Sequence, residues 1–370
     1  MLLILSYYSF VSFLQQEKKL SGGDKLNKDV DKNSINSKKI NRYRILKYIY
    51  ENKSTSQVIL SKSLGLSEST ISRNIRPYID NLLVHTGKSF STGGRKANLF
   101  SFNYSYKNIL SIQIDRDFLR ASIGELDGRI IEYYDKKVDN YNFDEFKVEL
   151  HNVLKYFNSY KDKIAAIVFG ISGYVLPNGN FYVSILDWNN IKSIDLVNVV
   201  KQYFNKSIIA FENDANLLAL RELHDPSQTG NHILCLYWER GLGMGLILDR
   251  KLYIGRGASG EIGQCVFTSK KLEDYLESIL RSEKIVWEIT KVLRNLFLLF
   301  DPDLIVLNGK FEKFFKDIHK IWTNEFSNPC KLIVSSGGDK AILEGGIYYG
   351  AELYLRNLTT GFKSNGKVWR

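Results

Sequence analysis

Glycines dominate the segment from Gly241 to Gln264, and they restrict its fold more than any other feature of this chain. Three of them, Gly241, Gly243 and Gly245, stand at alternate positions just before an apolar run. Because glycine permits close backbone approach and positive φ angles, this density predicts a hairpin that ends in a ligand-facing loop. A hairpin with a tight return and no ligand is the alternative that the glycines alone leave open.

Acidic and amide side chains follow at two positions where ligands can be bound. Glu261 lies in the glycine-rich loop itself, where a carboxylate can accept hydrogen bonds from sugar hydroxyls. Asn213 and Asp214 come after a predicted strand (207–211), and α/β folds place ligands at such strand ends. Asp214 is therefore a candidate general base and Asn213 a candidate hydroxyl ligand. An acid at this position would also suit the N-cap of the helix that follows, so both roles stay open for Asp214.

Strands and helices alternate from residue 109 onward, which predicts an α/β fold. Strands are expected at 109–114, 119–125, 130–134, 164–169, 207–211, 246–248, 252–254, 304–307 and 332–335. Helices are expected at about 143–157, 194–203, 217–223 and 271–299, from 311, and in a closing segment that contains Gly345 and Gly346.

Residues 39–103 have a different pattern, which predicts a winged helix-turn-helix domain. Helices are expected at 40–50 and 57–63, the second with Val58, Ile59 and Leu60 as its core face. Gly65 permits the turn that follows, and Ser67 is a good N-cap for a third helix. That helix is expected to bury Ile71, Ile75, Tyr78 and Ile79, and Pro77 is expected to kink or shorten it.

The third helix carries a polar face typical of a helix that enters the major groove of DNA. Hydroxyl side chains come first and arginines after, on the face opposite the core. The candidate DNA-binding residues are Ser67, Ser69, Thr70, Ser72, Arg73 and Arg76. A hairpin at 85–102 with Gly93, Gly94, Arg95 and Lys96 is the expected wing, placing Arg95 in or along a minor groove and Lys96 on phosphates. A helical bundle with a solvated polar face is the structural alternative.

Charge and cysteine content agree with a nucleic-acid partner. The formal net charge of +11 favours a polyanion, with nucleic acid before a membrane surface. The three cysteines are scattered, which is typical of a reducing compartment and here predicts a cytoplasmic protein. Residues 1–38 are expected to be a disordered extension or the product of a misassigned start. Their apolar beginning (1–14) is too short to span a bilayer and lacks the features of a signal peptide.

These motifs together resemble the ROK family (repressors, open reading frames and sugar kinases), in particular its xylose-repressor and N-acetylglucosamine-repressor type. The resemblance extends from residue 40 to about residue 355. It is carried by the segments 64–73, 93–96, 212–216, 257–263, 302–309 and 343–346. It implies an α/β protein in which residues 104–370 form a two-lobed, actin-like (ribonuclease H-like) sugar-kinase fold behind the winged helix-turn-helix. In the family's kinases, the aspartate at Asp214 activates a sugar hydroxyl and the glutamate at Glu261 holds sugar hydroxyls.

The phosphate loops of the family are altered in this chain. The first is Asp-x-Gly-Gly-Thr in the family and Asp115-Arg116-Asp117-Phe118-Leu119 here, where Phe118 would obstruct phosphates and Asp117 would repel them. The second, usually Gly-Thr-Gly-x-Gly, is Glu239-Arg240-Gly241-Leu242-Gly243. We therefore expect no ATP cofactor and no enzyme activity, with Asp214 as a vestigial base.

The zinc site of the family is also absent from the sequence. The family places a histidine after Glu-x-Gly, followed by a cysteine cluster, whereas this chain has Gln264 and a lone Cys265. A single cysteine cannot form the tetrahedral site that structural zinc requires, so no metal is expected. Gln264 remains able to hydrogen-bond a sugar as a neutral group.

The sequence thus predicts a DNA-binding transcriptional regulator, a repressor of sugar-metabolism genes. Its partners would be a double-stranded operator and a sugar or sugar-phosphate effector, held by Asn213, Asp214, Glu261 and Gln264. Palindromic operators imply a homodimer or homotetramer. An active ATP-dependent sugar kinase with an appended DNA-binding domain is one alternative, supported by the retained Asp214 and Glu261. A regulator controlled by a protein partner, with no sugar ligand, is the other.

Overall fold

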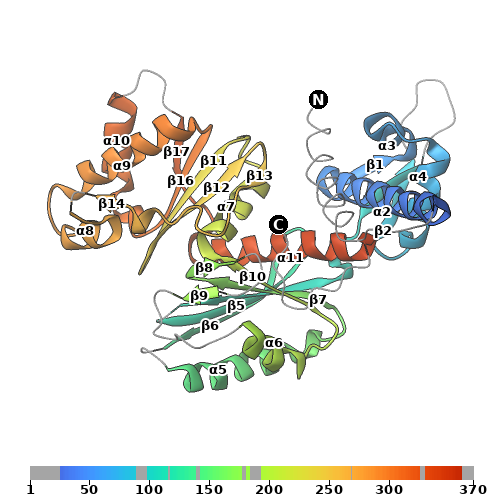
Figure 1. Cartoon of the computed structure of the whole chain (residues 1–370), viewed down its shortest axis with the longest axis horizontal. Helices are drawn as coiled ribbons and strands as arrows, with labels where there is room; N and C mark the ends of the chain where they lie inside the picture. The colour runs from blue at the N-terminus through green and yellow to red at the C-terminus, as the bar shows by residue number, and fades with distance from the viewer. Residues whose placement is uncertain are drawn as a thin grey trace.

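The fold is that of a computed structural model in which residues 26–88, 98–115, 117–138, 142–176, 181–183, 193–267, 269–325 and 330–360 are described. Figure 1 shows an N-terminal domain beside a pair of lobes, and the helices α7 and α11 lie between the sheets of the two lobes. No helix within these ranges has the length and apolar content needed to cross a membrane.

The N-terminal domain packs helices against a small antiparallel sheet. Its helices are α2 (Leu26–Asn52), α3 (Gln57–Leu64) and α4 (Glu68–Ile75), and its sheet has the order β1 (Ser54–Ser56), β3 (Asn98–Phe102), β2 (Leu83–Lys88). α2 begins at Leu26, within the extension expected at residues 1–38, and residues 1–25 lie outside the described ranges. β1 lies between the helices expected at 40–50 and 57–63, and it pairs with β3.

The core of this domain corrects one prediction and confirms another. In α3 the buried residues are Leu60 and Leu64, which lie one helical turn apart. Val58 and Ile59 are instead 36% and 47% exposed, so the predicted core face was wrong for both. In α4, Ile71 and Ile75 are fully buried as expected, whereas the partly buried Tyr78 and Ile79 follow the end of the helix. The chain passes into a 3-10 turn (Arg76–Tyr78) at Pro77, the predicted site of shortening.

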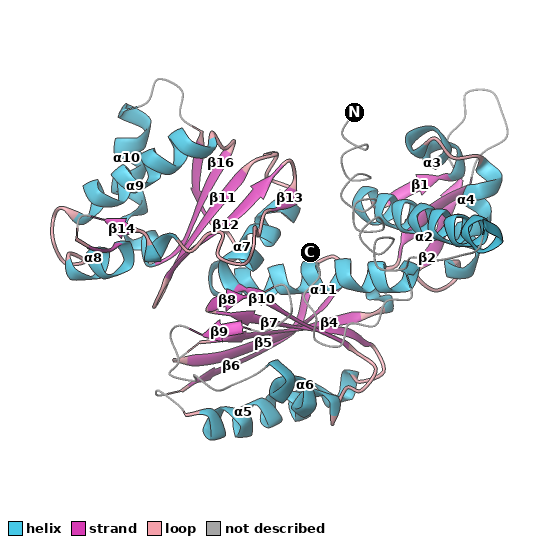
Figure 2. Cartoon of the chain, viewed as in Figure 1, coloured by secondary structure: helices cyan, strands magenta, loops and turns pink. Residues whose placement is uncertain are grey.

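The first lobe is a mixed sheet with the order β10-β7-β4-β5-β6. β10 (Ile208–Asn213) and β4 (Asn108–Ile114) run parallel to β7 (Ile164–Ile171), while β5 (Phe118–Glu125) and β6 (Ile130–Lys137) add antiparallel strands. Helices α5 (Phe143–Tyr156) and α6 (Ser193–Lys201) cover one face, and α11 (Ala341–Thr360) covers the other (Figure 2).

The second lobe has the sheet order β13-β12-β11-β16-β17. Its strands are β11 (Ile233–Trp238), β12 (Leu242–Leu248), β13 (Lys251–Leu252), β16 (Leu304–Gly309) and β17 (Lys331–Val334). β11, which the sequence patterns did not identify, pairs with β12 and β16 in the centre of this sheet. A short hairpin of β14 (Val266–Phe267) and β15 (Lys270–Lys271) lies between the glycine-rich loop and α8.

The long helix expected at 271–299 is two helices, so that prediction was wrong. α8 (Leu272–Ser278) and α9 (Ile285–Phe300) are separated by a turn in which Ser282 N donates to Ile279 O and Ile285 N donates to Ser282 O. The turn lets both helices contribute to the core of the second lobe, since Leu276 of α8 and Ile289 of α9 are both buried there. α10 (Phe315–Glu325) completes this layer.

Glycines allow α7 (Asp214–His224) to pack tightly between the lobes. A Cβ atom on Gly345 of α11 would lie 1.8 Å from the carbonyl oxygen of Leu217 in α7. A Cβ atom on Gly245 of β12 would lie 2.1 Å from the carbonyl oxygen of Ala215 in the same helix. α7 therefore contacts backbone on both sides and joins α11 to the second lobe.

Helix α11 also holds the N-terminal domain. Its Glu352 accepts hydrogen bonds from Tyr43 and Lys47 of α2 and, at 2.7 Å, from Arg356. Burial alone would raise the pKa of Glu352, but the Lys47 ammonium, the Arg356 guanidinium and the Tyr43 hydroxyl hold it well below its usual value. Helices α2 and α11 thus share one ionic cluster.

Candidate functional site

The polar face predicted for the third helix is displayed at the surface by α4. Ser67 caps the helix by accepting a hydrogen bond from Thr70 N at 3.2 Å, and Gly65 takes the left-handed conformation (φ 64°) in the preceding turn. Thr70 is half-buried, and the other predicted DNA-binding residues of this segment are exposed: Ser67, Ser69, Ser72, Arg73 and Arg76. The turn and the N-cap together leave hydroxyl groups at the helix start and guanidinium groups beyond them.

The predicted wing is described in its strands but not in its tip. β2 and β3 pair in antiparallel fashion, from Leu83 opposite Phe102 to Lys88 opposite Asn98. The expected DNA contacts Gly93, Gly94, Arg95 and Lys96 lie outside the described residues.

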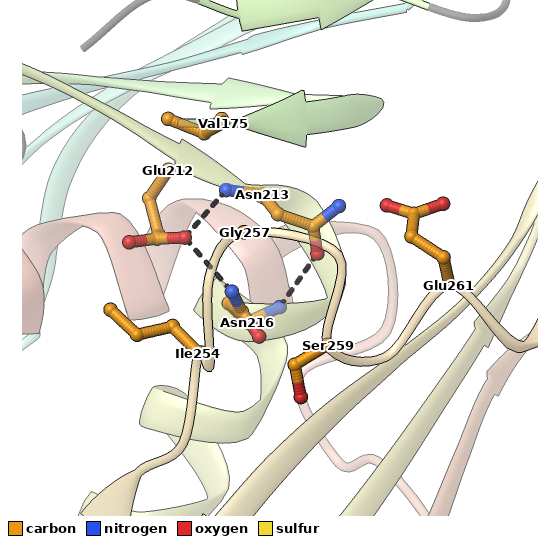
Figure 3. Close-up of a pocket in the computed structure, with 8 residues that line it drawn as sticks. All are labelled: Val175, Glu212, Asn213, Asn216, Ile254, Gly257, Ser259 and Glu261. Carbon is orange, nitrogen blue, oxygen red and sulfur yellow. Dashed lines mark hydrogen bonds between the residues drawn. The ribbon is translucent and has the colours of Figure 1, made fainter. Parts of the chain in front are cut away.

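A small pocket lies where the two lobes meet (Figure 3). The first lobe and α7 contribute one side of it, and the loop that follows β13 contributes the other. The empty space within it measures about 230 Å³, part of which is open to solvent. Its lining residues are Val175, Glu212, Asn213, Asn216, Ile254, Gly257, Ser259 and Glu261.

Glu212 organises the side of the pocket that ends β10. Its Oε1 accepts hydrogen bonds from Asn213 N and from Asn216 Nδ2, both at 2.9 Å. Asn213 caps α7 by accepting from Asn216 N at 3.1 Å, and its own Nδ2 donates to Gly173 O at 3.0 Å. Asn213 therefore lies at the predicted sugar site with a second amide hydrogen left for a ligand. Sequence reasoning missed Glu212 and Asn216 as site residues, although their spacing of one helical turn around the cap was a usable signal.

Asp214 is not among the residues that line the pocket, although it follows the lining residue Asn213 in the chain. It is the first residue of α7 and is buried, and its Oδ1 accepts a hydrogen bond from Ala215 N at 2.8 Å. The N-cap of this helix is Asn213, so the alternative role of Asp214 as the cap is wrong. Burial raises the pKa of Asp214 to about 7, against the lowering effect of hydrogen bonds from Ser172 and Ala215. The Asp214 carboxyl therefore changes its protonation state near neutral pH.

The glycine-rich loop holds Glu261 against the pocket. Gly260 adopts a φ of 92°, and a Cβ atom there would lie 1.8 Å from Met244 O, so only glycine fits. Met244 N donates to Gly260 O at 2.7 Å and ties the loop to β12. Burial, followed by the nearby carboxylate of Glu273, raises the pKa of Glu261 to about 7. The predicted close backbone approach and positive φ are both present here.

The Gln264 side chain contacts Glu273 of the same chain instead of lining the pocket. Its Nε2 donates to Glu273 Oε1 at 2.5 Å, and it is not one of the lining residues. Of the four predicted sugar-binding residues, Asn213 and Glu261 line the pocket, Asp214 supports it and Gln264 orients Glu273. Within the described ranges, no group of three or more His, Cys, Asp or Glu side chains is arranged to hold a metal ion.

Comparison with known proteins identifies both parts of the chain. Residues 110–273 match the sequence model of the ROK family, and residues 39–81 match that of a winged helix-turn-helix DNA-binding domain. The xylose repressor of Bacillus spizizenii is 28% identical over 232 residues, which are 61% of this chain and 60% of that protein. The chain therefore spans less than two thirds of the length of this relative.

Two solved structures share the fold. The crystal structure of a ROK family transcriptional regulator, a homolog of the E. coli MLC protein, covers 87% of this chain and 98% of its own, with a TM-score of 0.67 and 20% identity. The structure of a ROK family glucokinase from Streptomyces griseus, in complex with glucose and AMPPNP, covers 66% of this chain and 98% of its own. Its TM-score is 0.53 and its identity is 17%. These similarities confirm the predicted winged helix-turn-helix followed by a sugar-kinase-like α/β fold. The chain thus combines a segment similar to the ROK family (110–273) with a preceding segment similar to winged helix-turn-helix DNA-binding domains (39–81).

Proposed function

We propose that this protein is a DNA-binding transcriptional regulator, a repressor, that responds to an unphosphorylated sugar. The observation that carries the proposal is the exposed face of α4, in a domain that matches a DNA-binding model. Hydroxyl groups at its N-terminal end suit base edges in the major groove, and Arg73 and Arg76 suit phosphates or guanine. The similar protein from Bacillus spizizenii is named a xylose repressor, which supports the same assignment.

The pocket suits a neutral, hydroxyl-rich ligand. Both charged side chains among its described lining residues, Glu212 and Glu261, are carboxylates. A phosphate group would meet like charge there, whereas sugar hydroxyls can donate to carboxylate oxygens and accept from the Asn213 amide. We therefore narrow the expected effector from a sugar or sugar phosphate to an unphosphorylated sugar, with D-xylose as the first to test.

We further propose that the ROK domain has no kinase activity, since the two segments that would bind phosphates are altered. An active kinase stays the alternative that the buried Asp214 favours, because a base near neutrality suits proton abstraction. Incubation with ATP, Mg²⁺ and a sugar panel separates the two: sugar-dependent ADP release would establish the kinase. A regulator governed by a protein partner is the second alternative, and no stabilisation by any sugar would favour it. Homodimerisation, or a homotetramer, and a cytoplasmic location belong to the same proposal.

The DNA-binding part is tested by fluorescence anisotropy on the DNA upstream of the protein's own gene. We expect preference for one segment over random duplex and a log–log salt slope that is steep and negative. Arg73→Ala should weaken specific binding by about 5- to 150-fold, as loss of a base or phosphate contact does. Lys62→Ala removes one exposed cation from α3 and serves as the matched control. Equal effects of the two substitutions would contradict the role of α4.

A further inference from the structure

A bidentate ion pair joins the lobes at the rim of their junction. Asp117 lies between β4 and β5 of the first lobe, and Arg240 lies in the turn between β11 and β12 of the second. Arg240 Nε donates to Asp117 Oδ2 at 2.8 Å, and Arg240 Nη2 donates to both carboxylate oxygens at 2.6 Å. Such a fork fixes orientation as well as distance.

Both ends of this ion pair are anchored in tight turns. Asp117 N donates to Asp115 Oδ1 at 3.2 Å, and Asp115 N donates to Phe118 O at 3.2 Å. On the other side, Glu239 N donates to Gly241 O at 3.2 Å. The side-chain contact therefore links one strand connection in each lobe.

Further contacts cross the junction beside it. Gln113 of β4 donates from Nε2 to the hydroxyl of Tyr237 in β11 at 3.2 Å, and both residues are buried. Arg120 of β5 lies 3.4 Å from the carboxylate of Asp339, which belongs to the segment between β17 and α11. Buried and exposed contacts thus both join the two lobes.

We propose that this row of contacts is a latch that holds the lobes in one relative arrangement, with Asp117 and Arg240 as its breakable member. Their side chains are 40% and 47% exposed, so dissolved ions can reach and screen them, which the buried Gln113–Tyr237 bond does not allow. The pocket spans the same junction, with Asn213 on one side and the 254–261 loop on the other. The latch therefore sets the width of the pocket without any bound ligand.

The test is amide hydrogen exchange of the full chain in the absence of DNA and sugar. The readout is the 254–261 loop, which contains neither member of the ion pair. Arg240→Ala and Asp117→Ala should each speed exchange there about two- to fivefold, the range of exposed ion pairs, and the double substitution Asp117→Arg with Arg240→Asp should restore it. Raising the salt concentration should also speed amide exchange at 254–261 in the unaltered protein.

Arg129→Ala is the matched control, because Arg129 pairs with Glu125 inside a single lobe and is also exposed. Exchange at 254–261 should be unchanged in this variant. The proposal is overturned if Arg240→Ala leaves that exchange unchanged, if Arg129→Ala raises it equally, or if the charge reversal fails to restore it. A thermal melt of each variant establishes that the fold itself persists.

Discussion

Two carboxyl groups with raised pKa values lie in or next to the pocket: Glu261 lines it, and Asp214 follows the lining residue Asn213 in the chain. Asp214 owes its raised pKa to burial, and Glu261 owes its to burial and then to Glu273. A protonated carboxyl can donate as well as accept hydrogen bonds, whereas a carboxylate only accepts. The pocket can therefore match the mixed donor and acceptor pattern of sugar hydroxyls without a cation.

The titration of Asp214 makes stability depend on pH. Its pKa in the folded chain, about 7, lies above its ordinary value of 3.8, so the folded state binds the proton more tightly than the unfolded state. The stabilisation that protonated Asp214 contributes is complete below about pH 4 and is lost as pH rises through 7; it is on the order of 4 kcal/mol of unfolding free energy. Asp214→Asn should flatten this decline in melts recorded from pH 4 to 8.

Asp303→Asn is a control in which the pH dependence of stability should change in the opposite direction, because the pKa of Asp303 is lowered and not raised. Hydrogen bonds from the backbone amides of His232 and Asn231 lower the pKa of Asp303, so its ionised form stabilises the fold above its ordinary pKa. This variant should lose stability at neutral pH and little in acid. A decline in Asp214→Asn that parallels that of the unaltered chain would contradict the assignment.

At the scale of elements, α7 and α11 pack with their backbones in direct contact. Gly345 permits backbone contact between them, and His224 at the end of α7 stacks on Tyr348 of α11 with ring centroids 4.4 Å apart. α7 begins at the pocket, where Asn213 caps it. The helix pair therefore connects the pocket to the helix that holds the N-terminal domain.

Gly345→Ala tests this packing. Alanine is the better helix former by about 1 kcal/mol, but its Cβ would overlap the Leu217 carbonyl, and overpacking costs roughly 1 to 3 kcal/mol or more. We expect a net fall in melting temperature of several degrees. Asn357→Ala, a partly exposed position of the same helix, should have little effect. An unchanged melting temperature in Gly345→Ala would show that α7 and α11 can separate at little cost.

Local patterns predicted most elements because apolar runs bounded by turn residues report burial directly. The sequence located Asn213, Glu261 and the hydroxyl face of α4 through their places at strand ends, in a glycine loop and after an N-cap. It missed the break between α8 and α9, since helical periodicity continues through the turn at 279–284. Pocket members such as Val175 and Ile254 come together only through tertiary packing, so no local pattern could identify them.

At the scale of the whole molecule, the pocket and α4 are joined by continuous packing. α11 contacts α2 through Glu352, and Tyr50 of α2 donates to Leu126 O of the first lobe at 2.7 Å. Figure 1 shows α2 and α4 near one end of α11 and the second lobe near its other end. A change in lobe arrangement would therefore move α4 relative to the second lobe, and two arrangements with different ligand affinities are what ligand control of DNA binding requires.

The most direct measurement is operator affinity by fluorescence anisotropy with and without each sugar of a panel, beside the phosphorylated form of each. We predict that one unphosphorylated sugar changes the affinity about 5- to 150-fold, the usual range of coupling between sites, and that its phosphate does not. Glu261→Gln should reduce that response while the affinity without sugar stays the same. An operator affinity that no sugar alters, or no preference for any segment over random duplex, would contradict the proposed sugar-responsive regulator.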